Sequence, residues 1–131
     1  MRMKGREIKK GRACASALVS EMPISFLGGI DPKTGEVIAK DSDIRGQCIA
    51  GRVLVFPTGK GSTVGSYVLL RLMKNGAGPA AIINAASEPI VSVGAIIADI
   101  PMVDGIDISK IRTGDTVCVD GDTVSLEREG A

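Results

Sequence analysis

The stretch 53-VLVFPTGKGSTVGSYVLLRLMKNGAGPAAIIN-84 decides the expected fold, because it joins two apolar runs through a segment of helical periodicity. The run 53–56 is continuously apolar, which is typical of a strand covered on both faces. Apolar side chains then recur at helical spacing over 64–73, and Pro79 opens a second apolar strand over 80–84. Two strands joined by one helix normally lie parallel, with a right-handed crossover. The stretch therefore predicts a parallel β-α-β unit.

The ends of the predicted helix carry capping signals. Ser62 or Thr63 would cap the N-terminus through its side-chain oxygen. Asn75-Gly76 would end the helix, because both residue types tolerate the left-handed conformation found at helix C-termini.

The rest of the chain favours strands. We expect them at 12–20, at 36–38 after the turn signal 28-GGIDPKTGEVI-38, at the end of 41–51, at 93–98, and in a C-terminal hairpin within 113–127 around Asp120-Gly121. The expected fold is a single β-dominated α/β domain over residues 1–131 with few helices. The basic segment 1–10 is expected to be a frayed terminus.

Composition excludes several classes of function. The net charge of +1 argues against bulk electrostatic binding to nucleic acid, and an aromatic content of 2% argues against base stacking. No segment approaches the roughly 18 continuous apolar residues of a membrane span. No apolar signal-peptide core follows the basic N-terminus, so we expect a cytoplasmic location.

The side chains that usually build metal and nucleophile sites are scarce. Histidine is absent, which removes Ser-His-Asp and Cys-His systems and most zinc sites. Cys14, Cys48 and Cys118 are far apart and form no C-x-x-C pair, so we expect this chain to bind no metal. Because each cysteine sits among small or β-branched residues, we expect buried strand thiols.

The glycine-rich turn between the first strand and the helix matches no nucleotide motif fully. A P-loop would need glycine in place of Leu54 and serine or threonine in place of Gly61. The segment 59-GKGSTVG-65 is closer to a dinucleotide fingerprint, with Glu88 at the distance of a ribose ligand. Only one such unit is present, however, and the chain before it is β-rich.

A less specific interpretation rests on backbone chemistry. Consecutive N–H groups from Gly59 to Thr63 at a helix N-terminus would form an anion-binding concavity, and Lys60 adds a positive charge. The same dipoles would stabilise an alkoxide that develops on Ser62. The alternative is that Ser62 or Thr63 is only a helix cap, and the residues alone leave both interpretations open.

Several stretches together resemble a known family. They are 20-SEMPISFLGGIDPKTGEVI-38, 46-GQCIAGRVLVFPTGKGSTVGSYVLL-70, 79-PAAII-83 and 94-GAIIADIPMVDG-105. In this order they resemble the small subunits of archaeal aconitase X dehydratases, which are similar to the swivelling β/β/α domain of aconitases. The P-I-S-F-x-G-G-x-D-P-x-T-G and G-K-G-S-T-x-G-S motifs carry the resemblance.

The resemblance implies a hydro-lyase of two chains, a heterodimer or a higher assembly, that is active only when both are present. The large subunit of such enzymes carries a 4Fe-4S cluster, whose iron acts as a Lewis acid on the leaving hydroxyl. The small subunit supplies a serine base, which falls on Ser62. The implied reaction dehydrates (R)-5-phosphomevalonate to trans-anhydromevalonate 5-phosphate in the archaeal mevalonate pathway of isoprenoid biosynthesis.

Other residues are expected around this serine. Lys60, Gly61 and Thr63 would contact the substrate carboxylate or phosphate. Facing-loop or interface roles are assigned to Ser25, Gly28, Gly29 and Asp31, with a turn role favoured for the glycines and Asp31. Two alternative functions stay open: another aconitase X hydro-lyase, such as a hydroxyproline dehydratase, and a stand-alone phosphate- or nucleotide-binding module.

Overall fold

The structure, a computed structural model, describes residues 1–128. Its elements in chain order are β1 (Arg2–Lys4), β2 (Arg6–Lys9), β3 (Arg12–Val19), β4 (Val53–Phe56), α1 (Gly65–Lys74), β5 (Ala81–Asn84), α2 (Pro89–Ala98), β6 (Met102–Asp104), the 3-10 helix η1 (Ile108–Lys110), β7 (Thr116–Asp120) and β8 (Thr123–Glu127). None of the helices in this part of the chain is long and apolar enough to span a membrane.

The described strands form one mixed sheet in the order β1-β8-β7-β3-β4-β5-β6-β2. β3, β4, β5 and β6 are parallel neighbours at its centre. The outer neighbours pair antiparallel, and β7 and β8 form the predicted C-terminal hairpin. The predicted β-α-β unit is confirmed as β4-α1-β5, in which Val53 pairs with Ala81 and Phe56 with Asn84. The fold is thus a β-rich α/β arrangement with a parallel centre and few helices.

The N-terminal segment joins the two ends of this sheet. β1 pairs with β8 and β2 pairs with β6, and only Gly5 separates the two short strands. A Cβ atom at Gly5 would overlap the carbonyl oxygen of Asp104, so no larger residue fits there. The prediction of a frayed terminus over 1–10 is therefore wrong. Met3 and Ile8 pack against the cores, while the basic side chains between them point outward.

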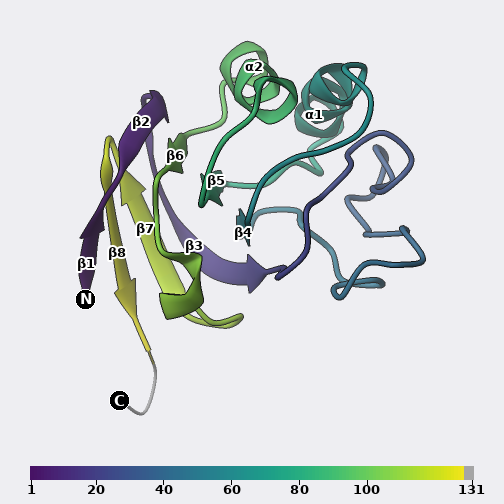
Figure 1. The fold of residues 1–131 in the computed structure, drawn as a ribbon. Coiled ribbons are helices and arrows are strands. Elements are labelled where there is room, and N and C mark those ends of the chain that lie inside the picture. Colours follow the sequence, from purple (N-terminus) through teal and green to yellow (C-terminus); the bar gives the residue numbers. More distant parts are fainter. Residues whose placement is uncertain (129–131) are drawn as a thin grey trace.

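The central strands are buried on both faces, as their apolar runs predicted. On one face α1 and α2 lie side by side over the parallel strands (Figure 1). The core between these helices and the sheet includes Leu54 and Ile82 from the strands and Leu69, Leu72 and Val91 from the helices. The other face packs against the antiparallel strands through a second core, which includes Val55, Ile83, Val103, Val117 and Val124.

A close contact sets the spacing of the two helices. A Cβ atom at Gly94 would lie 2.5 Å from the Cδ1 atom of Leu69 and 3.1 Å from the Cα atom of Ser66. The Ser66 hydroxyl donates a hydrogen bond of 2.6 Å to the carbonyl oxygen of Ile90. Small residues at these positions let the helices approach closely, and the hydrogen bond fixes the start of α2 relative to the first turn of α1.

The prediction of a strand over 93–98 is wrong, because these residues belong to helix α2. The helix begins at Pro89, which suits the first helical position, and Glu88 caps it. The Glu88 carboxylate accepts hydrogen bonds of 2.9 Å from Ile90 N and 2.8 Å from Val91 N. The cap overrides the strand preference of the β-branched residues that follow.

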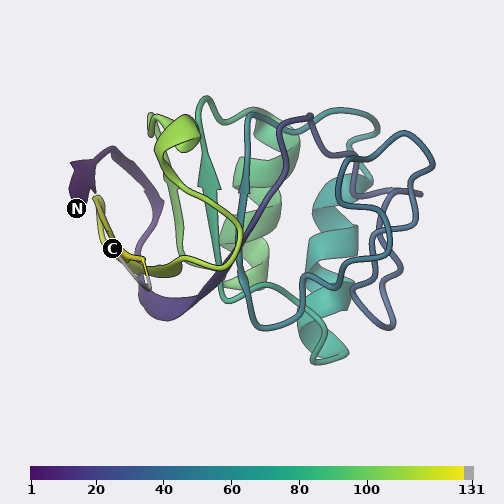
Figure 2. The ribbon, with the colours of Figure 1, turned by 90° about the horizontal axis from the view of Figure 1, so that it is seen from below.

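The segment between β3 and β4 lies beside α1, at the far side of the molecule from the N-terminus (Figure 2). The short strands predicted at 36–38 and at the end of 41–51 are wrong, because the structure has only the single bridges Ile30–Val37 and Glu36–Cys48 there. Gly35, Gly46 and Gly51 take positive φ angles in this segment, which interrupts extended pairing.

The prediction of three buried thiols is also wrong. Cys14 and Cys118 lie opposite each other on β3 and β7 and form a disulfide, and Cys48 is a free, exposed cysteine. The apolar neighbours that suggested burial, such as Ala13 and Val117, point into the core. Because side chains alternate across a strand, the cysteines between those neighbours point outward.

Candidate active site

The glycine-rich turn connects the carboxyl end of β4 to α1 and is packed closely from both sides. A Cβ atom at Gly59 would overlap the Glu88 carboxylate and the Val91 side chain at the start of α2. Gly61 takes a φ angle of +93°, and a Cβ atom there would overlap the Ser25 hydroxyl. The glycines therefore let the turn pass between α2 and the segment that contains Ser25.

That segment is held against the turn by main-chain hydrogen bonds. Ile24 N donates 3.2 Å to the carbonyl oxygen of Thr58, and Lys60 N donates 3.0 Å to the carbonyl oxygen of Ile24. The Ser25 hydroxyl donates 3.2 Å to the carbonyl oxygen of Leu27. Two stretches far apart in the sequence thus form one unit.

Ser62 lies at the exposed tip of this unit. Its Oγ atom accepts a hydrogen bond of 3.2 Å from Val64 N, and no acceptor for its own O–H group is found within residues 1–128. The expected cap at Ser62 or Thr63 is wrong, because α1 begins at Gly65 and its N-cap is Val64, which has no side-chain cap. Ser62 instead closes a short hydroxyl-to-backbone turn just before the helix.

The anion-binding concavity is smaller than the sequence suggested. The Lys60 N–H is already used by Ile24. Within the described chain, the N–H groups of Gly61, Ser62 and Thr63 have no acceptor. These three donors next to the start of α1 form an electropositive surface around the Ser62 hydroxyl.

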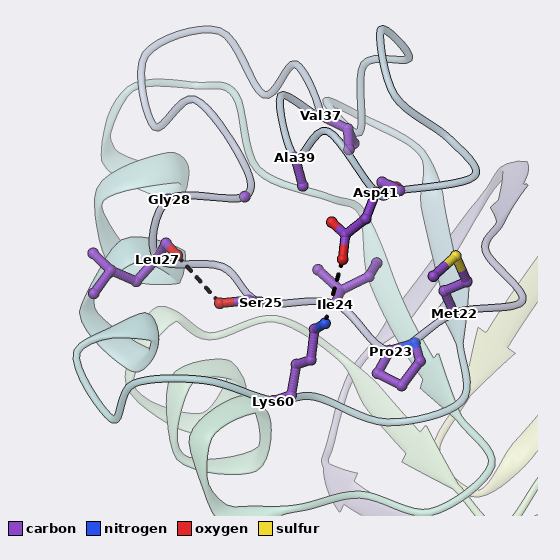
Figure 3. A pocket seen from close by; sticks show the side chains of 12 residues that line it. Met22, Pro23, Ile24, Ser25, Leu27, Gly28, Val37, Ala39, Asp41 and Lys60 are labelled. Carbon is purple, nitrogen blue, oxygen red and sulfur yellow. Dashed lines mark hydrogen bonds and ion pairs between the residues drawn. The ribbon is translucent and has the colours of Figure 1, made fainter.

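A cavity of about 320 Å³ opens beside the turn (Figure 3). Its wall is mainly apolar and includes Met22, Ile24, Leu27, Val37 and Ala39. At its edge the Lys60 and Asp41 side chains point toward each other, with Nζ and Oδ2 3.8 Å apart (Figure 3). Both side chains are exposed, so the ion pair is weak, and another anion can replace Asp41 beside Lys60.

The sequence profile of a family described as the aconitase X swivel domain matches residues 2–127. The chain belongs to this family.

Relatives match the swivel domain over nearly its whole length. A protein named phosphomevalonate dehydratase small subunit from Thermococcus kodakarensis is 58% identical, with 97% of this chain and 96% of the relative covered. A protein of the same name from Methanocella arvoryzae is 56% identical, with 97% and 98% covered.

Solved structures agree with the fold. The crystal structure of Thermococcus kodakaraensis aconitase X in its holo-form is 55% identical, with a TM-score of 0.96 and coverage of 98% of this chain and 99% of that chain. A second structure, determined by NMR in solution, is 51% identical with a TM-score of 0.89, and 98% and 100% are covered.

The structure of this swivel domain brings together most of the residues that the sequence singled out. Ser25, Gly28, Gly29 and Lys60 all line the cavity. Gly61 contacts Ser25, whereas Ser62 and Thr63 lie outside the cavity on the exposed tip of the turn.

Asp31 does not reach the cavity and occupies a turn. Its Oδ1 atom accepts a hydrogen bond of 2.9 Å from Lys33 N, and its main chain bonds to Glu36 and Gly35. This position matches the turn role that the sequence favoured for it.

Sequence reasoning missed two acidic residues of the loop 41-DSDIRG-46. Asp41 pairs with Lys60. Asp43 accepts hydrogen bonds of 2.6 Å from Ser20 Oγ and 2.7 Å from Glu21 N, which fixes the chain as it leaves β3. The only signal in the sequence was the two aspartates of D-S-D, in a segment that was predicted to be mostly a loop.

The structure argues against a dinucleotide site, because the carboxylate expected to bind the ribose is used elsewhere. Glu88 stood at the distance of a ribose-binding carboxylate, but both of its oxygens accept hydrogen bonds from the first turn of α2.

The carboxyl groups whose pKa values are lowered by hydrogen bonds lie outside the site. Hydrogen bonds from Arg6 and, to a smaller extent, from Ser87 lower the pKa of Asp104 to about 2 against the opposing effect of burial. A hydrogen bond from Arg128 lowers the pKa of Asp115. These groups stabilise the fold at its edges.

Proposed function

We propose that this chain is the small subunit of a phosphomevalonate dehydratase, which converts (R)-5-phosphomevalonate to trans-anhydromevalonate 5-phosphate in the archaeal mevalonate pathway. The observation that carries the proposal is the full-length likeness to relatives of that name. The geometry of the glycine-rich turn supports a catalytic role for this chain within such an enzyme.

Ser62 is the proposed proton acceptor. In the dehydration, a proton leaves the carbon next to the substrate carboxylate, hydroxide leaves the neighbouring carbon, and a double bond forms between the two carbons. Ser62 Oγ would take the proton. The electropositive start of α1 next to it would stabilise a serine oxygen that carries negative charge.

Lys60, Gly61 and Thr63 are the proposed substrate contacts. The Lys60 ammonium would exchange Asp41 for a carboxylate or phosphate of the substrate. Gly61 and Thr63 would donate main-chain N–H groups to the same anion. Ser25, Gly28 and Gly29 would shape the facing wall of the cavity, and Asp31 would hold the turn behind it.

The 4Fe-4S cluster is proposed to belong to the larger subunit. The residues of this chain do not fit a cluster, because Cys14 and Cys118 are bonded to each other and only Cys48 remains as a free thiol ligand. Within residues 1–128 no group of three or more possible metal ligands comes together. The residues of this chain would therefore supply only the proton transfer and the charge stabilisation.

The proposal is tested by reconstitution without oxygen. The wild-type chain and its Ser62→Ala variant are each combined with the large subunit from the same genome, and dehydration of phosphomevalonate is measured. We expect Ser62→Ala to lower kcat by at least about 100-fold, which is the usual contribution of a general base. The complex should still form, because Ser62 is exposed and makes a single hydrogen bond with Val64.

Ser16→Ala is the matched control, since Ser16 is an exposed serine on β3. Its turnover should equal that of the wild type. Near-normal turnover of Ser62→Ala would show that the base is another residue. Turnover of hydroxyproline instead of phosphomevalonate would assign the chain to a different aconitase X hydro-lyase.

A further inference from the structure

Helix α2 is apolar on every side, which is unusual for a helix at a protein surface. Its sequence, 89-PIVSVGAIIA-98, contains no charged residue. Helices of this composition are normally buried all round. One side of α2 packs on the core and on α1, but Val93, Ile96 and Ile97 are 47%, 51% and 42% exposed.

The neighbouring helix extends the same apolar surface. Tyr67 on α1 is 63% exposed, and it faces α2 across a groove of about 480 Å³. Figure 1 shows the two helices side by side on the outer side of the sheet. We call this surface the helix patch and define it by Tyr67, Leu70, Pro89, Ile90, Val93 and Ile97, none of which carries a charge.

The helix patch is continuous with the glycine-rich turn. Thr63, which follows Ser62 directly, also lines the groove, and Val64 next to it is exposed. If Ser62 acts on a substrate held by another chain, that chain must lie over the turn. A chain in this position also reaches the helix patch.

We propose that the helix patch is the docking surface for the larger subunit. This inference rests on the proposed function, which requires a second chain at Ser62. The lack of charge disfavours nucleic acid and anionic membrane surfaces, both of which select basic residues. Stable subunit interfaces have an apolar core depleted of charge and enriched in residues such as tyrosine, and this is the composition of the helix patch.

A second copy of this chain is a poorer occupant. A symmetric pair would bring the helix patch of each copy against that of the other. The glycine-rich turns would then lie at the edge of the pair, where the second copy hinders access of the larger subunit to Ser62.

The experiment compares two substitutions of the same type. Ile97→Glu places a charge in the helix patch, and Met73→Glu places the same charge on an apolar residue of α1 of similar exposure, 37%, outside both the helix patch and the cavity. Binding of each purified full-length variant to the large subunit from the same genome is measured by calorimetry. We expect Ile97→Glu to weaken binding at least tenfold and Met73→Glu to change it less than threefold.

A second variant guards against misfolding. Tyr67→Ala removes an exposed aromatic side chain and introduces a good helix former, so it should weaken binding without loss of the fold. Circular dichroism and thermal unfolding of the isolated variants check that they are folded. Dehydratase activity of Ile97→Glu should recover when the chain is added in large excess, because only the affinity has changed.

The possible failures are distinguishable. If the wild-type chain forms no complex with the large subunit, the proposed function fails, and the inference with it. If the complex forms and both helix-patch variants bind like the wild type, only the docking surface is overturned. The same conclusion follows if the wild type is a dimer that Ile97→Glu separates into monomers while the affinity for the large subunit is unchanged.

Discussion

Gly61 holds the main chain in a conformation that few other residues adopt, directly before the proposed base. Its φ angle is +93°, and the Ser25 hydroxyl occupies the place where a Cβ atom would be. The position of the Ser62 hydroxyl thus depends on the absence of a side chain one residue earlier.

Replacing Gly61 should therefore damage both stability and activity. We expect Gly61→Ala to lower the free energy of unfolding by about 1–3 kcal/mol, through backbone strain and the contact with Ser25. Gly46→Ala is the control, because Gly46 has a φ angle of +88° and open space around it. Urea unfolding measures the free energy of unfolding of both variants. Equal destabilisation in the two would mean that the Ser25 contact contributes nothing.

The residues of the site differ in how well they could be predicted. Ser62 and Lys60 stand in a motif whose chemistry is local, so their place on an electropositive turn followed from the sequence. Asp41 reaches Lys60, and Asp43 reaches Ser20 at the end of β3, only because the segment between β3 and β4 folds back. No local pattern encodes such a contact.

At the scale of elements, whether a segment could be predicted as helix or strand depended on its hydrophobic period and on its capping residues. The β4-α1-β5 unit was predictable because its hydrophobic period changes clearly between strand and helix. Helix α2 was not, because 93-VGAIIA-98 suits a buried strand and a buried helix equally by composition. The decisive signal was the Glu88-Pro89 pair before it, which caps and starts the helix.

Removal of the α2 cap should destabilise the fold. We expect Glu88→Ala to lower the free energy of unfolding by about 0.5–2 kcal/mol, because Ile90 N and Val91 N both lose their acceptor. Activity should fall as well, since Glu88 also packs against Gly59 in the turn. Glu36→Ala, which removes an exposed carboxylate from a loop, is the control. Denaturant midpoints that coincide for the two variants would contradict this role of Glu88.

At the scale of the molecule, one ion pair ties the N-terminal strand to the parallel strands. Arg6 donates hydrogen bonds of 3.0 Å and 2.8 Å to the two oxygens of Asp104, and Ser87 donates 2.7 Å to one of them. Asp104 is buried, so its carboxylate depends on these partners.

Because of this ion pair, the free energy of unfolding should fall as the pH is lowered through the acid range. The pKa of Asp104 is lowered to about 2 in the fold, so its contribution is complete above the ordinary carboxyl value and is lost as pH falls from about 4 to 2. We expect Asp104→Asn to lose up to about 2 kcal/mol of unfolding free energy at pH 7 and to show a shallower decline in acid. Denaturant titrations at several pH values measure both effects.

Asp122→Asn is the control for that experiment. Asp122 pairs with Lys4 of the same N-terminal segment, but the pair is exposed and 3.8 Å apart, so little change is expected. A decline in acid that is as steep in Asp104→Asn as in the wild type would show that other carboxylates, such as Asp115, dominate.

The N-terminal segment on either side of Gly5, which forms β1 and β2, limits the order in which the sheet can fold. It leaves the ribosome first, yet its partners β6 and β8 leave late, β8 ending at residue 127. During synthesis this segment has no place in the sheet, and its pairing requires contacts between the two ends of the chain, which form slowly. Closure of the sheet is therefore expected to be among the last events of folding: β2 cannot pair before β6 has emerged, and β1 cannot pair before the final hairpin has emerged.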